Sequence, residues 1–144
     1  MLRGTWLAGA VLGALSVLAT GGALAEQAKI VAVKFHADWC GSCEAIQPAI
    51  DEARDSVNSP DVAFVTLDLT DEATTADAME LAEAAGITEA YETFGPKTGF
   101  VLLIDTQSGE AVAKMTKTHS AADLQGLIAS ALAGELEPIE APAS

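Results

Sequence analysis

The feature that most constrains the fold is a short buried strand that leads into a helix, with both cysteines of the chain at the junction. The run from Lys29 to Phe35 (KIVAVKF) is apolar and rich in β-branched residues, which is typical of a strand buried on both faces of a sheet. From Gly41 to about Val57, apolar residues recur at three- and four-residue steps, and this spacing predicts an amphipathic helix. The stretch HADWCGSC at this junction contains Cys40 and Cys43, the only two cysteines among 144 residues.

The rest of the chain continues the alternation of strands and helices. The remaining predicted elements are a strand from Val62 to Leu69, a helix capped at Thr70 that ends near Ala85, strands from Phe100 to Asp105 and from Glu110 to Thr116, and a helix from Ser120 to about Leu132. This order predicts one small α/β domain, in which helices flank a central mixed sheet.

The amino terminus has the features of an export signal. Arg3 supplies a positive charge, Trp6 to Thr20 form an uncharged apolar run, and Ala23-Leu24-Ala25 provides a small-residue cleavage site. We therefore interpret residues 1–25 as a signal peptide, so that the mature chain begins at Glu26. The alternative is an uncleaved membrane anchor, because the apolar stretch is just long enough to cross a bilayer.

Acidic residues dominate the charge of the chain. Seven Lys and Arg residues against 21 Asp and Glu residues give a formal net charge of −14, and such a field repels nucleic acid and anionic lipid surfaces. We therefore expect no nucleic-acid partner. Residues 134–144 (GELEPIEAPAS) are acidic, contain two prolines and lack periodicity, so they predict a disordered tail behind a domain that spans residues 26–133.

The cysteine pair is open to a redox, a metal-binding or a structural interpretation. A thiolate at Cys40 would lie at the amino terminus of the predicted helix, where unpaired N–H groups and the helix dipole lower its pKa, and Cys43 is placed to resolve a mixed disulfide. A structural zinc site needs more ligands, and His36 and His119 have no diagnostic spacing. Copper(I) accepts two thiolates and stays open. A bridge across so small a loop removes little entropy from the unfolded chain, which argues against a purely structural role.

The stretch VKFHADWCGSCEAIQPAI resembles the strand, active-site motif and proline-containing helix of the thioredoxin superfamily. The match includes Trp39 before the first cysteine, and Pro48 five residues after the second. Within the superfamily the sequence is most similar to periplasmic thioredoxin-like domains, such as the carboxyl-terminal domains of disulfide interchange proteins. The resemblance implies a thioredoxin-like α/β fold and dithiol exchange by Cys40 and Cys43.

Two residues of the predicted strand depart from the family pattern. Lys34 stands where thioredoxins carry an aspartate that is assigned as a proton acceptor for the buried cysteine. A charged lysine there would favour thiolate, whereas a lysine that snorkels to the sheet edge would have no such role. His36 replaces an aromatic residue and shares a face with Lys34, so it either tunes the thiols or packs with an ordinary hydrogen bond.

The loop TFGPKTGF departs from the family at the place of its cis-proline, which faces the motif and holds the substrate. Alignment of the strand that follows puts Gly99 in that place, after Thr98, and leaves Pro96 three residues early. Pro96 is then either a displaced substrate-binding proline or only a turn former. Loss of the proline would loosen the substrate groove and, since this proline is thought to discourage metal binding in the family, would strengthen the copper alternative.

These features together predict an exported, periplasmic thiol-disulfide oxidoreductase. Its predicted site comprises the catalytic pair, the residues that shape the site and the loop that binds the substrate backbone: Cys40, Cys43, Trp39, Gly41, Ser42, Thr98 and Gly99. No organic cofactor is expected, because the disulfide is itself the redox group. The expected partners are protein thiols or disulfides and a separate redox protein in or at the membrane, and we expect the domain to be a monomer. The alternatives are a copper(I)-handling protein and a non-catalytic thioredoxin-fold module that binds an assembly partner.

Overall fold

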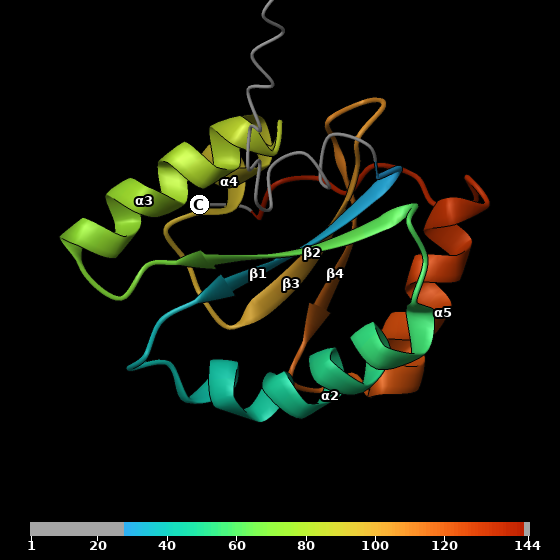
Figure 1. Cartoon of the computed structure of the whole chain (residues 1–144), viewed down its shortest axis with the longest axis horizontal. Helices are drawn as coiled ribbons and strands as arrows, with labels where there is room; N and C mark the ends of the chain where they lie inside the picture. Colours follow the sequence, from blue (N-terminus) through green and yellow to red (C-terminus); the bar gives the residue numbers. More distant parts are fainter. Residues whose placement is uncertain (1–27, 143–144) are drawn as a thin grey trace, which may run out of the picture.

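The computed structural model describes residues 28–142, which form a four-stranded sheet with helices on both faces (Figure 1). The elements in chain order are β1 (Ile30–His36), α2 (Gly41–Val57), β2 (Val62–Asp68), α3 (Glu72–Ala84), α4 (Thr88–Phe94), β3 (Phe100–Asp105), β4 (Ala111–Thr116) and α5 (Ala121–Leu132). The predicted α/β class, with a mixed sheet between helices, is confirmed.

The predicted signal peptide, residues 1–25, lies outside the described residues. Within residues 28–142, no helix is long and apolar enough to span a bilayer. The choice between a cleaved signal and a retained anchor therefore stays a prediction.

The strand β1 lies inside the sheet, whose strand order is β2-β1-β3-β4. It pairs in parallel with β2 and antiparallel with β3, and β3 pairs antiparallel with β4. The first six residues of β1 are buried, and only His36 at its end is partly exposed. This burial explains the continuous apolar sequence of the strand. The cysteines follow the carboxyl end of this central strand, where a short loop leads into α2.

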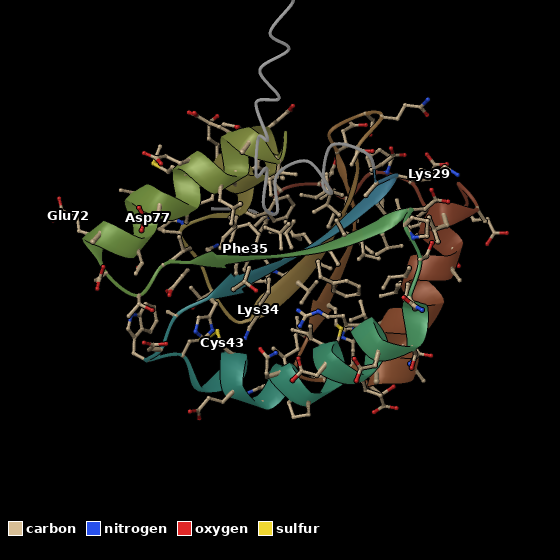
Figure 2. All side chains as sticks on the ribbon, in the orientation of Figure 1. Lys29, Lys34, Phe35, Cys43, Glu72 and Asp77 are labelled. Carbon is tan, nitrogen blue, oxygen red and sulfur yellow. A yellow bond between two sulfur atoms is a disulfide. The ribbon has the colours of Figure 1, made fainter. Side chains whose placement is uncertain are left out.

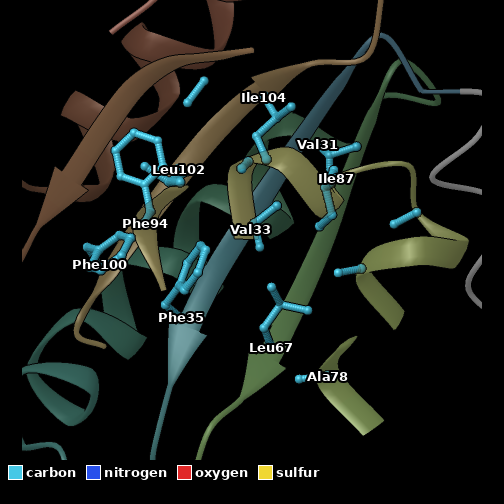
Figure 3. Close-up of a cluster of buried hydrophobic side chains, with 14 of the residues drawn as sticks. Val31, Val33, Phe35, Leu67, Ala78, Ile87, Phe94, Phe100, Leu102 and Ile104 are labelled. Carbon is cyan, nitrogen blue, oxygen red and sulfur yellow. The ribbon is translucent and has the colours of Figure 1, made fainter. Parts of the chain in front are cut away.

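Alternate residues of β1 face opposite helical layers, as the two-residue period of a strand requires. Val31, Val33 and Phe35 pack in a cluster with residues of α3 and α4 (Figure 3). Ile30 and Ala32 pack on the other face, with residues of α2 and α5. The buried strand thus joins two apolar layers, and its even-numbered residues face the helix that follows the motif.

The helix ends follow local capping rules, with one correction. The sequence predicts Thr70 as the cap of α3, but the N-cap is Asp71, whose Oδ1 accepts the N–H of Thr74 at 2.9 Å. Ser120 caps α5 as predicted, because its hydroxyl oxygen accepts the N–H of Asp123 at 3.2 Å. Thr70 is thereby left free for contacts with the active-site loop.

The sequence does not predict the helix α4. It has seven residues, and its N-cap, Ile87, makes no capping hydrogen bond with its side chain. Ala90 and Phe94 are buried in the same apolar cluster as residues of α3. Packing therefore holds this helix in the absence of a local start signal.

The sequence predicts a disordered tail over residues 134–144, whereas the structure shows contacts between this segment and the domain. Up to Pro142 the segment has no helix or strand, but Leu136 packs against the cluster on the α2 and α5 face, and Ile139 packs against the opposite cluster. The N–H of Ile139 also donates to the carbonyl oxygen of Ala111 at 2.8 Å. Two apolar residues among acidic ones thus hold the segment against the end of the sheet.

Candidate active site

The two cysteines lie where β1 leads into α2, and they form a disulfide. Their Cα atoms are 5.3 Å apart, which is an ordinary separation for such a bridge. Cys43 is fully buried, whereas 8% of the surface of Cys40 is exposed. Cys40 is therefore the sulfur that a partner can reach, which favours the predicted roles of attacking and resolving cysteine.

Cys40 is the N-cap residue of α2. Its Sγ accepts the backbone N–H of Cys43 at 3.2 Å. After reduction, a thiolate at this sulfur would keep that hydrogen bond and would lie at the positive end of the helix dipole, and both effects lower the pKa of a thiol. Cys40 thus lies at the amino terminus of α2, which is the position that the sequence predicts.

The loop before β3 brings Gly99 against the disulfide. A Cβ atom at Gly99 would lie 3.3 Å from Cys40 Sγ and 2.8 Å from Ser42 Cβ, and the φ of Gly99 is +90°, a conformation that favours glycine. Pro96, three residues earlier, is exposed, and its peptide bond with Gly95 is cis. The sequence offers Pro96 and Gly99 as the residue that faces the cysteine motif. In the structure, Gly99 contacts the motif.

The carbonyl oxygen of Phe35, on β1, contacts both the loop before β3 and Cys43 on α2. It accepts the N–H of Gly99 at 2.9 Å and lies 3.5 Å from Cys43 Sγ. Because the N–H of Gly99 is used inside the domain, it is not available to a substrate. The sequence predicts that the backbone of Thr98 and Gly99 binds the substrate, but the N–H of Gly99 cannot do so. Thr98, which is half-buried, remains the candidate for substrate binding.

Lys34 does not snorkel to the sheet edge. It is only 6% exposed, and its Nζ donates to Gln47 Oε1 on α2. Gln47 Nε2 in turn donates to Asp51 Oδ1 at 2.8 Å. Burial lowers the pKa of Lys34, and the nearby Asp51 carboxylate opposes that shift.

His36 is only partly satisfied. Its Nε2 lies 3.2 Å from Asp38 Oδ1, but its Nδ1 is buried with no hydrogen-bond partner among the described residues. The ordinary hydrogen bond expected for this histidine is thus present at one ring nitrogen. It links the end of β1 to the loop that precedes the motif.

Trp39 and Asp38 are fixed by Thr70, a contact that the sequence did not suggest. The indole of Trp39 is 67% exposed, yet its Nε1 donates to the carbonyl oxygen of Thr70 at 3.0 Å. Thr70 Oγ1 accepts the N–H of Asp38 at 2.9 Å, and the Thr70 N–H donates to Asp68 Oδ1 at 2.9 Å. The hydrogen bonds from Thr70, those of its hydroxyl first, hold the pKa of Asp68 below its usual range. The sequence predicts Thr70 as a helix cap, and this prediction gives no indication of its contacts with Asp38 and Trp39.

The two residues between the cysteines differ in their surroundings. Gly41 is exposed, and a Cβ there would meet nothing within 4 Å. Ser42 is half-buried and lies against Gly99. The contact between Ser42 and Gly99 supports the predicted site-shaping role of Ser42. Gly41 has no such contact, because it borders open space.

A metal at this site would depend on the two sulfurs. Over residues 28–142, no group of three or more His, Cys, Asp or Glu side chains is arranged to hold a metal ion. Two thiolates, available only after reduction, are a donor set that suits copper(I).

Comparison with known proteins finds similarity to thioredoxins over part of the chain. Residues 21–87 match the Thioredoxin family. Over 44 residues the chain is 48% identical to Thioredoxin H2 of Arabidopsis thaliana and 39% identical to a protein named as a disulfide-isomerase in Schizosaccharomyces pombe. Each match covers 31% of this chain, and respectively 32% and 9% of those proteins. The chain therefore spans about a third or less of the length of these relatives.

A solved structure supports the fold over a larger part of the chain. A mutant thioredoxin from Halobacterium salinarum NRC-1 superimposes with a TM-score of 0.50 and 23% identity, over 76% of this chain and 80% of that one. At this level of identity the likeness concerns the fold alone. The chain therefore has a thioredoxin-like fold, with its cysteine pair at the start of α2.

Proposed function

We propose that the protein is an exported thiol-disulfide oxidoreductase whose redox group is the disulfide between Cys40 and Cys43. The observation that carries the proposal is the position of this disulfide at the amino terminus of α2, with Cys40 Sγ as the cap. A thiolate in such a position is stabilised and is ready to attack a disulfide. The matches to proteins named as thioredoxin and disulfide-isomerase support the same chemistry.

The proposed reaction has two exchange steps. The Cys40 thiolate attacks one sulfur of a partner disulfide and forms a mixed disulfide, while the other partner sulfur leaves as a thiolate. Cys43 then loses its proton to water, and its thiolate attacks the Cys40 sulfur, which restores the internal disulfide and releases the second partner thiolate. Two electrons thereby pass to the partner. With a dithiol partner the same steps run in reverse, and the electrons pass to the protein.

We infer that the substrate is a protein segment bound beside Trp39 and Thr98. Trp39 presents an exposed aromatic surface that Thr70 holds in place. Thr98 precedes the glycine that lies against Cys40, which supports a role of its backbone in strand-like hydrogen bonds with an extended chain. A partner bound in this way would bring its disulfide to the exposed side of Cys40.

Export and redox partners complete the proposal. The charged start, apolar run and small-residue site of residues 1–25 favour export, and a periplasmic location would allow disulfides to persist. The resemblance to periplasmic disulfide interchange domains favours the same location. A separate redox protein would reset the cysteine pair after each turnover, and the domain would act as a monomer.

Trapping of mixed disulfides tests this proposal. In the Cys43→Ser variant the first step proceeds and the second cannot, so partner proteins should accumulate as adducts that dithiothreitol releases. The Cys40→Ser variant is the matched control, because it also keeps one cysteine but lacks the attacking one. Adducts should form with the first variant and not with the second. Equal amounts in both variants, or adducts in neither, would refute the assignment.

Copper(I) binding is the second candidate function, and the contact between Gly99 and Cys40 favours it. In this place the family has a proline that is thought to discourage metal binding, whereas here a glycine lies against the sulfur. Copper(I) should be titrated into the reduced wild-type protein and the Cys40→Ser variant. Stoichiometric binding that the variant loses, without turnover of a disulfide substrate, would favour a metal-handling role, and absence of binding would exclude it.

A further inference from the structure

Lys34 is the one charged side chain that is buried within residues 28–142, at 6% exposure. The two exchange steps proposed above do not use it. A buried lysine without a role costs stability, because its charge is taken out of water. We therefore consider which groups near Lys34 its positive charge could stabilise.

Two observations link Lys34 to the region of Cys43 through neighbouring residues. Its Nζ donates to Gln47 Oε1, and Gln47 follows Cys43 by four residues on α2, so these two side chains are neighbours on the helix surface. On the strand, the carbonyl oxygen of the adjacent residue, Phe35, lies 3.5 Å from Cys43 Sγ. Figure 2 shows Lys34 and Cys43 in the same region, where β1 approaches the first turns of α2.

The charged side chains near Lys34 have partly opposing effects on its ammonium group. On α2, the Asp51 carboxylate favours the ammonium form and the Arg54 guanidinium opposes it. On β1, His36 follows on the same face, and its β2 partner in the sheet is Asp68. The β3 residue opposite Lys34 is the apolar Val101. Among residues 28–142, Lys34 is therefore the one buried cation near the start of α2.

We propose that Lys34 is a positioning residue whose ammonium group stabilises the thiolate of the reduced pair. Near neutral pH, the disulfide takes up two electrons and one proton and becomes one thiolate and one thiol. A nearby cation lowers the free energy of this anion and leaves the neutral disulfide unaffected, so it shifts the equilibrium toward the reduced form. This inference rests on the proposed function, because it concerns the same cysteine pair.

Two neutral variants, Lys34→Met and Lys34→Gln, test this inference. Both variants remove the charge, but only Lys34→Gln keeps a polar group that can bind Gln47. An effect that both variants share is therefore due to the loss of the charge. Replacing a buried charge with a side chain of similar volume is compatible with folding. Lys29→Met is the matched control, because Lys29 lies just before the other end of β1, exposed and paired with Asp61.

The thiolate of the reduced protein should be titrated by its ultraviolet absorbance, and the equilibrium with dithiothreitol measured at a pH between the two thiol pKa values, where the reduced pair carries one thiolate. Both Lys34 variants should raise the thiol pKa by about one unit and shift the equilibrium about tenfold toward the disulfide, which equals about 30 mV for a two-electron couple. Unchanged values, or an equal shift in Lys29→Met, would overturn the role of Lys34. Failure of the wild-type pair to interconvert would instead overturn the proposed function.

Discussion

Gly99 lies against the sulfur of Cys40, so closely that a Cβ atom there would be 3.3 Å from Sγ and 2.8 Å from Ser42 Cβ. The two residues are far apart in the sequence, and the bond between the Gly99 N–H and the Phe35 carbonyl brings them together. The backbone of the loop before β3 therefore forms one wall of the site.

This contact predicts a specific effect of Gly99→Ala. The variant should lose about 3 kcal/mol of unfolding free energy, from strain at positive φ and from the clash with Ser42. Gly109→Ala is the control, because Gly109 also has a positive φ, of +77°, but open space for a Cβ. Denaturant unfolding should show a loss of about 1 kcal/mol for the control, and only Gly99→Ala should slow disulfide exchange. Equal losses in the two variants would mean that the contact with the motif is unimportant.

The cap of α2 predicts a difference between two inactive variants. Cys40→Ser and Cys40→Ala should both abolish exchange, but a serine hydroxyl can still accept the Cys43 N–H, which alanine cannot. Loss of a cap costs about 1 kcal/mol. In denaturant unfolding under reducing conditions, where wild type and variants all lack the disulfide, Cys40→Ala should be less stable than Cys40→Ser by about that amount. The same stability for both would show that the residue at position 40 contributes nothing as a cap.

The lowered pKa of Asp68 predicts a pH-dependent role for Thr70. Because the carboxyl has a lower pKa in the folded state, its contribution is present above about pH 4 and is lost as the pH falls through the folded-state pKa. Thr70→Val should therefore cost about 1 kcal/mol at pH 7, and the gap to wild type should narrow toward pH 3. Thr66→Val, at an exposed position on β2, is the control and should show no such trend. A gap independent of pH would contradict the link between the two residues.

The packed tail predicts that Ile139 contributes to stability. Ile139→Ala should cost about 1–2 kcal/mol, because the side chain is partly buried against the apolar cluster. Glu137→Ala, in the same segment but exposed, should change the unfolding free energy by less than about 0.5 kcal/mol. If the two variants are equally stable, the tail does not pack in solution.

The sequence predicts those parts of the fold that depend on local signals. The helix that follows Cys40 has a clear apolar periodicity, and the four strands are short apolar runs between turns. The helix α4 has neither a polar cap nor enough length to show a period. The packing of Leu136 and Ile139 was hidden because the acidic residues and prolines around them are typical of disorder.

The candidate site shows the same division. The cysteine pair could be read directly, because its chemistry depends on a spacing of three residues and on the helix that follows. The contact of Gly99 with Cys40 and the bonds of Thr70 with Asp38 and Trp39 join segments distant in the chain. Such contacts are fixed by the sheet topology, so residue spacing alone does not reveal them.

The most direct test of the central claim is the redox equilibrium of the Cys40-Cys43 pair in dithiothreitol or glutathione buffers, measured by thiol trapping. We expect reversible, two-electron conversion between disulfide and dithiol at a defined potential. A potential near about −270 mV would indicate a reductant, and one near about −120 mV an oxidant that introduces disulfides. A pair that never forms the internal disulfide at any buffer ratio would contradict the proposal that this domain exchanges disulfides.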